Sequence, residues 1–94
     1  MLSKYRIFET DEFEKKLKKL IKKDYEFVYK KLIEYIYPQI IEEPAFGKNI
    51  KKLKGYNPET WRDRIGNYRI FYSISNEEKI VYIFTIDKRK DSCK

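Results

Sequence analysis

The spacing of hydrophobic and polar residues changes along the chain, and each change predicts an element. Residues 4–9, KYRIFE, alternate between polar and apolar positions, which is typical of a short strand. Thr10 has the character of a helix N-cap, and apolar residues then recur at helical spacing among lysines as far as Lys23. A second helical run covers residues 25–36, and Pro38 is expected to end it because the residue before a proline avoids helical geometry. The two runs together predict a helical hairpin.

The second helical run has an apolar stripe that is expected to face the core. It consists of Tyr25, Val28, Tyr29, Leu32, Ile33 and Ile36.

The second half of the chain predicts a loop and then strands. Residues 38–49 contain prolines and a glycine and are expected to form the loop. Three runs rich in Ile, Val, Tyr and Phe follow at 60–65, 68–75 and 79–87, and the last is apolar on both faces, as in a central strand. The order β-α-α-β-β-β predicts an α+β fold, with the helices on one face of a small sheet whose last three strands form an antiparallel meander. Residues 1–94 are expected to form a single domain, with the first strand docked against a later one.

Gly66 and Asn67, between two of these runs, are a strong signal for a two-residue hairpin turn. Such a turn places Arg64 opposite Arg69, and side chains then alternate between the two faces. One face carries Arg62, Arg64, Arg69 and Phe71. The other, expected to be the core face, carries Trp61, Ile65, Tyr68, Ile70 and Tyr72. Asp63 also falls on the core face, where an apolar residue would be expected.

The arginines of this hairpin are the strongest pointer to function. Like charges directly opposite each other destabilise a sheet by a few tenths to about 1 kcal/mol, and no acidic residue of this hairpin face offsets them. Arginine binds phosphate through two N–H groups and stays charged at any physiological pH. The pattern therefore predicts a phosphate-binding face. The alternative is that acidic residues from elsewhere in the fold, or solvent, satisfy the arginines.

The overall charge agrees with a polyanionic partner. The chain has 22 Lys and Arg against 15 Asp and Glu and no His, a formal net charge of +7. This balance favours nucleic acid or the ribosome as partner, although a lysine-rich solvated surface gives the same balance. The segment KNIKKLKG at 48–55 is especially rich in lysine.

Several other classes of protein are not indicated. Cys93 is the only cysteine, so no internal disulfide can form. No apolar run approaches the roughly 18 residues of a membrane span, and charges at positions 4 and 6 interrupt any signal-peptide core. We therefore expect a cytoplasmic protein with no membrane partner, no metal and no cofactor.

Three blocks of the sequence resemble a known family. IKKLKG (50–55), WRDRIGNYRIFYSI (61–74) and KIVYIFTIDKRKD (79–91) are similar to the RelE/ParE superfamily of toxins from type II toxin–antitoxin systems, in particular to its RelE-like branch. The opening strand and the helical hairpin fit the same pattern. The resemblance implies two helices packed against a twisted sheet of about four strands. It also implies an endoribonuclease that cuts messenger RNA in the ribosomal decoding site, where the 2′-hydroxyl attacks the adjacent phosphate and a base is held by stacking.

The resemblance assigns roles to particular residues. Arg62 and Arg64 match the two basic positions before the turn, Arg69 matches the phosphate-binding arginine after it, and Arg89 matches the arginine that acts on the leaving group. These arginines are the predicted catalytic set. The predicted RNA- or ribosome-binding residues are Lys48, Lys51, Lys52, Lys54, Phe71, Lys88 and Lys90. The implied partners are the ribosome, messenger RNA and a cognate acidic antitoxin, and a heterotetramer with the antitoxin is one implied assembly.

The chain also departs from the family near its C-terminal end. Many active members have a His or a Tyr there, whereas this chain has Asp87 and Cys93 and no His, so the usual carriers of a near-neutral general base are missing. Glu59 and Asp87 remain as candidate bases. Two alternatives therefore stay open beside the nuclease. One is a ParE-like toxin that inhibits a topoisomerase without nuclease chemistry, and the other is an inactive relative that still binds RNA or the ribosome.

Overall fold

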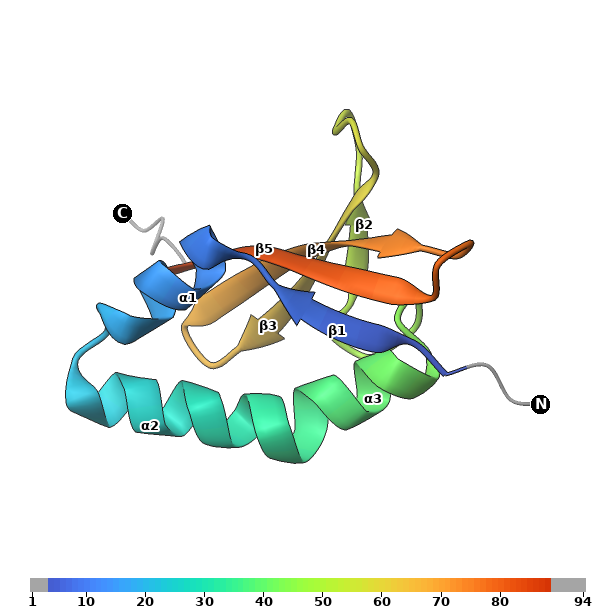
Figure 1. The fold of residues 1–94 in the computed structure, drawn as a ribbon. Coiled ribbons are helices and arrows are strands. Elements are labelled where there is room, and N and C mark those ends of the chain that lie inside the picture. Colours follow the sequence, from blue (N-terminus) through green and yellow to red (C-terminus); the bar gives the residue numbers. More distant parts are fainter. Residues whose placement is uncertain (1–3, 89–94) are drawn as a thin grey trace.

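Five strands form one mixed sheet, and the helices connect the first strand to the others (Figure 1). The computed structural model describes residues 4–88. Its elements are β1 (Arg6–Glu9), α1 (Asp11–Lys18), α2 (Lys22–Lys31), the π-helical segment η1 (Leu32–Ile36), α3 (Tyr37–Glu42), β2 (Lys51–Leu53), β3 (Thr60–Ile65), β4 (Tyr68–Ser75) and β5 (Ile80–Lys88). The strands lie side by side in the order β1–β5–β4–β3–β2. This arrangement confirms the predicted α+β fold class.

The first strand docks against the last one, as the order of the elements predicts. β1 runs parallel to β5, with Arg6 opposite Ile80 and Glu9 opposite Ile83. β5 also pairs with β4, in the antiparallel sense, so it has a neighbour on each side. The apolar run of β5 is thus that of a central strand, as predicted.

A β-bulge in β5 is tied to the residue that starts α1. The pairing of β4 with β5 shifts by one residue after Phe71 and Thr85, which leaves Phe84 as an extra residue in β5. The Thr10 hydroxyl donates a hydrogen bond of 2.8 Å to the Phe84 carbonyl oxygen. The same hydroxyl oxygen accepts from the Phe13 N–H at 3.2 Å and caps α1. The predicted N-cap is therefore confirmed, and it also anchors the bulge.

α1 is shorter than the sequence predicts. The helix expected as far as Lys23 ends at Lys18, and the chain turns at Ile21, where the backbone is extended with ψ of 154°. The short helix already buries Phe13 and Leu17 in the core. The turn then directs α2 across the face of the sheet, as Figure 1 shows.

The prediction that Pro38 ends the second helix is wrong. α2, η1 and α3 form one continuous helical rod (Figure 1). At the end of η1 the Tyr37 N–H donates to the carbonyl oxygen of Leu32, five residues back, which is the π-helical pattern. Pro38 then lies in the first turn of α3, where the missing N–H is tolerated. The loop expected at 38–49 therefore begins only at Glu43.

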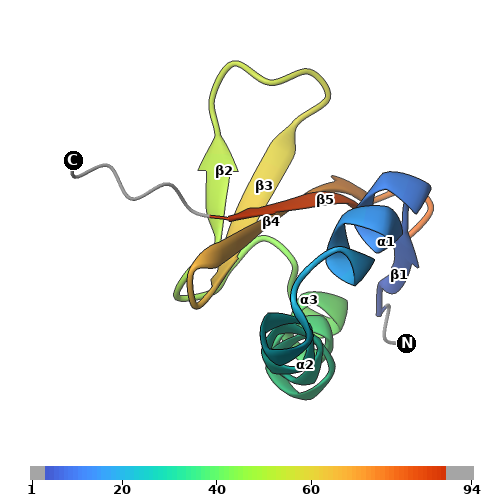
Figure 2. The ribbon, with the colours of Figure 1, turned by 90° about the vertical axis from the view of Figure 1, so that its left-hand side faces the viewer.

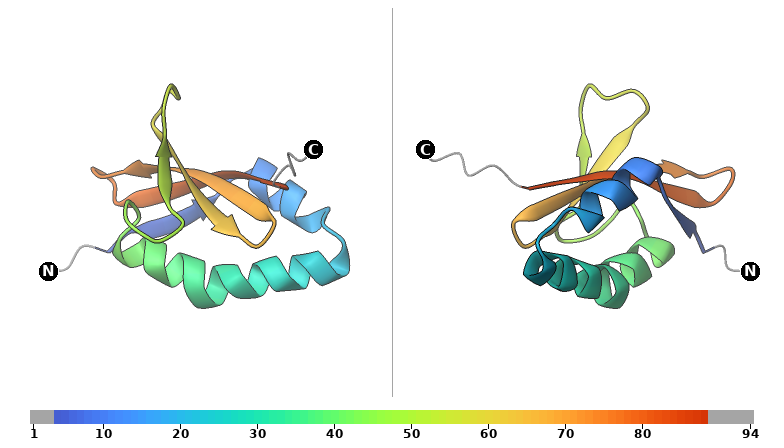
Figure 3. Two further views of the ribbon diagram at one scale, coloured as in Figure 1. Left: turned by 180° about the vertical axis from the view of Figure 1, so that it is seen from behind. Right: turned by 60° about the vertical axis from the view of Figure 1, so that its left-hand side comes forward.

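The helices and one face of the sheet enclose a single apolar core. Its buried residues are Phe13, Leu17, Val28, Leu32, Ile40, Ile65, Tyr68, Ile70, Tyr72, Val81, Ile83 and Ile86. The sheet residues among them confirm the predicted core face of the hairpin. Tyr29 and Ile33 of the predicted stripe are instead 48% and 47% exposed, because the buried line of the rod runs through Val28 and Leu32 and leaves them on its flank. Figures 2 and 3 show α2 and α3 on one side of the sheet.

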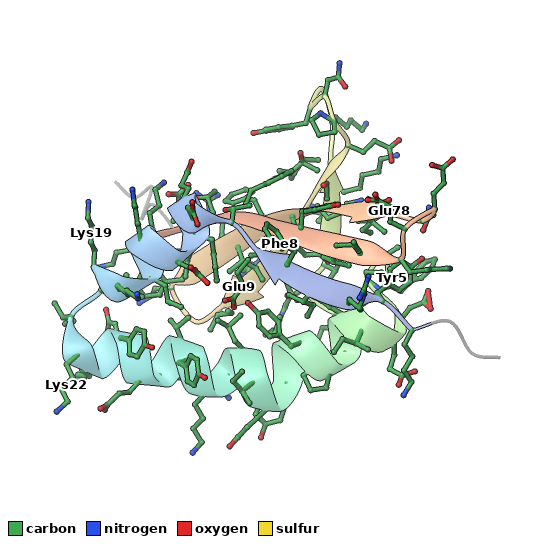
Figure 4. The ribbon with its side chains drawn as sticks, viewed as in Figure 1. Tyr5, Phe8, Glu9, Lys19, Lys22 and Glu78 are labelled. Carbon is green, nitrogen blue, oxygen red and sulfur yellow. The ribbon has the colours of Figure 1, made fainter. Side chains whose placement is uncertain are left out.

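A hydrogen bond fastens the rod to the edge strand β1. The Tyr37 hydroxyl donates to Glu9 Oε2 at 2.6 Å, and Figure 4 shows Glu9 pointing from β1 toward the rod. Burial raises the pKa of Tyr37 far above its usual value, and the Glu9 carboxylate adds to this rise. Tyr37 therefore stays protonated and remains a hydrogen-bond donor at physiological pH.

The sheet has one strand more than the sequence predicts. β2 is three residues long and contains two lysines, so neither its length nor its composition signals a strand. It forms because it pairs with β3, where Lys51 lies opposite Arg62 and Leu53 opposite Thr60. No helix within residues 4–88 is long and apolar enough to cross a membrane.

Candidate functional site

The β3–β4 hairpin has the register that its sequence predicts. Its cross-strand pairs are Ile65–Tyr68, Arg64–Arg69, Asp63–Ile70, Arg62–Phe71 and Trp61–Tyr72. Gly66 in the turn has a φ of +59°, a left-handed conformation that glycine adopts without strain. A Cβ atom here would lie 2.8 Å from Cε2 of Phe27, so the turn also packs closely on α2. Both the turn geometry and this close approach favour glycine.

The face of the sheet that points away from the rod is strongly basic. We term it the arginine face and define its cations as Lys51, Arg62, Arg64 and Arg69. Lys51 of β2 lies opposite Arg62 of β3, and Arg64 of β3 lies opposite Arg69 of β4. Neighbouring strands are about 4.8 Å apart, so the backbone positions that carry these cations are close together. The predicted grouping of the three arginines on one face is confirmed by the register, and α2 and α3 lie on the opposite side (Figure 2).

Arg69 has a hydrogen-bond donor with no acceptor. Its Nε is buried and has no hydrogen-bond partner in the described part of the chain. Its guanidinium carbon lies 5.7 Å from the centre of the Phe71 ring, a cation–π distance. Neither Arg64 nor Arg69 forms an ion pair with a carboxylate of residues 4–88. A carboxylate nevertheless lies next to Arg69 in the sheet, since Asp87 of β5 is directly opposite it and accepts from Lys16.

Asp63 lies buried behind the arginine face and is 3% exposed. Its Oδ1 accepts a hydrogen bond of 2.8 Å from the backbone N–H of Arg64. Burial raises the pKa of Asp63 above its usual value, although the Arg64 N–H and the Arg62 charge act in the opposite direction. The sequence alone did not explain why a carboxyl group stands on the core face. In the structure it fixes the backbone N–H of Arg64, next to two of the arginines.

The two carboxylates proposed as bases project to different sides of the sheet. Asp87 of β5 lies opposite Arg69 on the arginine face, and its Oδ1 accepts a hydrogen bond from Lys16 Nζ at 3.1 Å. The hydrogen bond to Asp87 raises the pKa of Lys16. Glu59, just before β3, pairs with Lys52 at 3.1 Å. Because Lys52 projects to the side of the sheet that faces the rod, Glu59 is held away from the arginines.

The predicted RNA-binding lysines do not form one surface. Lys51 lies on the arginine face, Lys48 and Lys54 are exposed on either side of β2, and Lys52 and Lys88 project to the side of the rod. Phe71, predicted in the same group, lies on the arginine face beside Arg69. Two further predicted residues, Arg89 and Lys90, lie outside the described residues.

A hollow of about 260 Å³ opens on the arginine face beside Phe71. It is lined by Tyr56, Thr60, Phe71, Phe84, Thr85 and Asp87. The bulge in β5 brings both Phe84 and Thr85 to this hollow, and Thr85 Oγ1 is buried without a hydrogen-bond partner. Sequence reasoning missed Tyr56, Phe84 and Thr85, because the run IVYIFTI carries no signal of the bulge and reads as an uninterrupted strand.

Comparison with known proteins agrees with the resemblance seen in the sequence. A family model described as the ParE toxin of the type II toxin–antitoxin system parDE matches residues 7–92. No sequence among the curated proteins matches the chain.

Three solved structures illustrate the likeness of the fold. A chain of the archaeal RelE–RelB complex from Pyrococcus horikoshii OT3 is 24% identical, with 95% of this chain and 99% of that chain covered and a TM-score of 0.72. A chain of the RelBE2 toxin–antitoxin complex from Mycobacterium tuberculosis is 26% identical, with 92% and 99% covered and a TM-score of 0.70. The isolated RelE toxin of E. coli is 25% identical, with 95% and 88% covered and a TM-score of 0.68.

Proposed function

Because the chain belongs to the ParE toxin family of type II toxin–antitoxin systems, we propose that it arrests growth by cutting messenger RNA on the ribosome. The observation that carries this proposal is the arginine face, whose cations gather on neighbouring strands of the sheet on the side away from α2 and α3. Similarity to the isolated RelE toxin of E. coli supports the RelE-like branch of the family, for which we propose this function.

The arginine face suits a reaction that builds negative charge on a phosphate. In RNA cleavage the 2′-oxygen forms a bond to the adjacent phosphorus, the bond to the 5′-oxygen breaks, and the phosphate oxygens carry additional charge in between. Arg69 would bind the phosphate through its guanidinium group, and Arg62 and Arg64 on the neighbouring strand would stabilise the added charge. Arg89, which the family resemblance assigns to the leaving oxygen, lies outside the described residues. Since the chain has no His, charge neutralisation and alignment of the RNA by the ribosome would carry most of the rate.

A second candidate function is inhibition of a topoisomerase by binding alone. Two observations favour it: the matching family model describes ParE toxins, and a chain without His lacks the usual near-neutral base. In that case the arginine face would bind an acidic partner and cut nothing. An inactive relative that binds the ribosome is the third candidate, and it would use the same face without cleavage.

The decisive experiment maps the 5′ ends of messenger RNA on purified ribosomes programmed with a defined message. Wild-type protein is expected to create new 5′ ends within the codon of the decoding site. Arg69→Ala is expected to abolish them while keeping the fold, since it removes no core volume. Arg6→Ala is the matched control, because Arg6 is an exposed arginine on β1, at the other edge of the sheet.

The candidate functions give different results in parallel assays. Inhibition of DNA supercoiling by a purified topoisomerase, without new 5′ ends, would favour the ParE-like candidate. Ribosome binding that depends on Arg69, again without new 5′ ends, would favour the inactive relative. If Arg69→Ala retains full cleavage, the arginine face is not the active site. Arg89→Ala, tested beside it, is expected to lose cleavage as well.

We also propose an acidic antitoxin that folds on this chain and silences it. An apolar helix of such a partner would lie on the toxin's helices or along a sheet edge, which is the usual binding mode of segments that fold on binding. The rod offers exposed apolar side chains for it: Phe27, Tyr29, Ile33 and Tyr35 are 46%, 48%, 47% and 59% exposed. An amphipathic helix can cover side chains of this kind, and its acidic residues would be drawn to the basic surface nearby. The test is to search for an adjacent reading frame that encodes a small acidic protein and to co-express the two, because Tyr35→Ser should then escape neutralisation while staying toxic.

A further inference from the structure

The arginine face carries a carboxylate of its own. The acidic residues of the described strands are Glu9, Asp63 and Asp87. Glu9 bonds to Tyr37 of the rod, and Asp63 is buried behind the arginine face. Among these strand residues only Asp87 stands on the side of the arginines, directly opposite Arg69. This position calls for an explanation, because a negative charge there repels the phosphate that the arginines attract.

The ion pair with Lys16 does not explain why the carboxylate is there. Lys16 Nζ lies 3.1 Å from Asp87 Oδ1, and the two side chains are 42% and 48% exposed. An ion pair as exposed as this one stabilises a fold very little. It does fix the carboxylate, because Lys16 occupies Oδ1 and leaves Oδ2 to accept a proton. A side chain with this exposure is also open to a ligand on the arginine face.

Asp87 and Arg69 lie side by side without forming an ion pair with each other. The Arg69 guanidinium carbon lies 5.7 Å from the centre of the Phe71 ring, whereas the carboxylate is bound to Lys16. Facing side chains on neighbouring strands have Cβ atoms about 4.5–5.5 Å apart, so a phosphate bound to the guanidinium has the carboxylate beside it. In RNA poised for cleavage the attacking 2′-oxygen is roughly 3–3.5 Å from the phosphorus. This oxygen is therefore within reach of Asp87.

The other carboxylate that the sequence offered as a base has no such position. Glu59 pairs with Lys52 at 3.1 Å, on the side of the sheet that faces the rod. Asp87, in contrast, lines the hollow of about 260 Å³ that opens on the arginine face beside Phe71. The structure thus separates two candidate bases that the sequence left equal.

We propose that Asp87 is the general base of the cleavage reaction, and this inference rests on the proposed nuclease function. Asp87 Oδ2 takes the proton of the 2′-hydroxyl as the 2′-oxygen bonds to phosphorus and the bond to the 5′-oxygen breaks. The products are a 2′,3′-cyclic phosphate and a 5′-hydroxyl whose proton comes from water. The hydroxide left by that water takes the proton from Asp87, so the enzyme returns to its starting state. A positioned general base contributes about 10²–10⁴-fold to the rate of such a reaction.

The test measures single-turnover cleavage of a defined message on purified ribosomes, with ribosome binding measured in parallel. Asp87→Asn keeps the size of the side chain and is expected to lower the cleavage rate about 100-fold without weakening ribosome binding. Glu12→Gln is the matched control, because Glu12 contacts the same Lys16 at 3.5 Å from α1 and should keep the full rate. Asp87→Glu, which restores a carboxylate, should recover part of the rate.

A message with sulfur in place of the scissile 5′-oxygen shows which proton transfer is affected. A thiolate leaves without receiving a proton, so this message needs no help at the leaving group and still needs a base. Arg89→Ala, which removes the arginine that the family resemblance assigns to the leaving oxygen, should cleave it nearly as fast as wild type. Asp87→Asn should remain about 100-fold slower than wild type. Cleavage of the sulfur message by Asp87→Asn at the wild-type rate would overturn the inference, since Asp87 would then act on the leaving group.

Two further results would also overturn the inference. A wild-type rate for Asp87→Asn on the ordinary message, with tighter ribosome binding, would mean that the carboxylate only offsets the charge of the arginines. A loss of cleavage in Glu59→Gln, with Asp87→Asn unaffected, would move the base to Glu59. Failure of the proposed function looks different, because wild type itself would then create no new 5′ ends.

Discussion

Phosphate should stabilise the free protein through Arg69. The buried Nε of Arg69 has no acceptor, and Arg69 faces Arg64 across the hairpin. A phosphate ion bound at the Arg69 guanidinium group offsets a like-charge repulsion of roughly 0.2–1 kcal/mol. At ten times its Kd, any ligand that binds only the folded state stabilises it by about 1.4 kcal/mol. For a domain of 94 residues this corresponds to a rise in melting temperature of roughly 6–11 °C.

The matched variants separate this specific effect from general salt effects. Arg69→Ala removes both the repulsion and a cation–π contact with Phe71 worth about 0.5–1 kcal/mol. These two terms nearly cancel, so the variant should melt close to wild type in chloride. It should, however, lose most of the additional stabilisation by phosphate. Arg6→Ala on β1 should keep the whole response.

The assay is thermal unfolding followed by circular dichroism in sodium phosphate and in sodium chloride of equal ionic strength. Phosphate also stabilises proteins generally because it is excluded from their surface, so only the part that Arg69→Ala abolishes counts. Equal responses of wild type and Arg69→Ala would refute the reasoning. In that case the arginines are a solvated surface and not a phosphate site.

Three further predictions concern single side chains. Asp63→Asn should raise the free energy of unfolding at pH 7, because burial raises the pKa of Asp63 above its usual 3.8 and the charged form is disfavoured in the folded state. The raised pKa also means that the folded state binds a proton at Asp63 more tightly than the unfolded state does. The free energy of unfolding of wild type should therefore increase, relative to that of Asp63→Asn, as the pH falls from the raised pKa toward 3.8. Tyr68→Phe should cost about 1.5 kcal/mol in urea unfolding, because the Tyr68 hydroxyl donates to Asp24 Oδ2 at 2.6 Å. Lys51→Gln should lower the salt dependence of RNA binding by about 0.7–0.9 in slope, whereas Lys52→Gln should change it little.

Each of these predictions has a contradicting outcome. A pH dependence of stability that is the same in wild type and Asp63→Asn would show that another group titrates. Unchanged stability of Tyr68→Phe would mean that water replaces the hydroxyl at no cost. Equal effects of the two lysine substitutions would mean that RNA contacts both sides of β2, contrary to the placement of Lys52 beside Glu59.

The parts of the fold that follow from local rules could be predicted from the sequence. The Gly66-Asn67 turn fixes the register of its own hairpin, and the period of two then determines which residues share a face. This was enough to gather the arginines on one face and to identify the core face behind them. The N-cap at Thr10 is equally local, since one side chain and the next helical turn define it.

The parts that depend on tertiary context could not be predicted. A one-residue change in hydrogen bonding at η1 lets the helix continue through Pro38, and no residue of that segment signals it. β2 is held by pairing with β3 and not by its own preference. The bulge at Phe84 shapes the hollow beside Phe71, and the Phe84 carbonyl oxygen accepts a hydrogen bond from Thr10. These two residues are far apart in the sequence, so local rules do not reveal their contact. The arginines of the site were therefore predictable, whereas the shape of the surface beside them was not.

The pairing of β1 with β5 bears on how the chain can be made in a living cell. Thr10 and Phe84, which join the two ends of the fold, are 74 residues apart, and closing so long a loop is slow because its entropy must be lost before any contact forms. A nascent chain without β5 lacks the strand that joins β1 to the rest of the sheet, and it lacks one wall of the hollow. The chain therefore cannot complete its fold until β5 has been synthesised, and the ribosome that makes it meets no folded copy of that chain before then. The interval before folding is also the time in which a partner already present can meet the emerging chain.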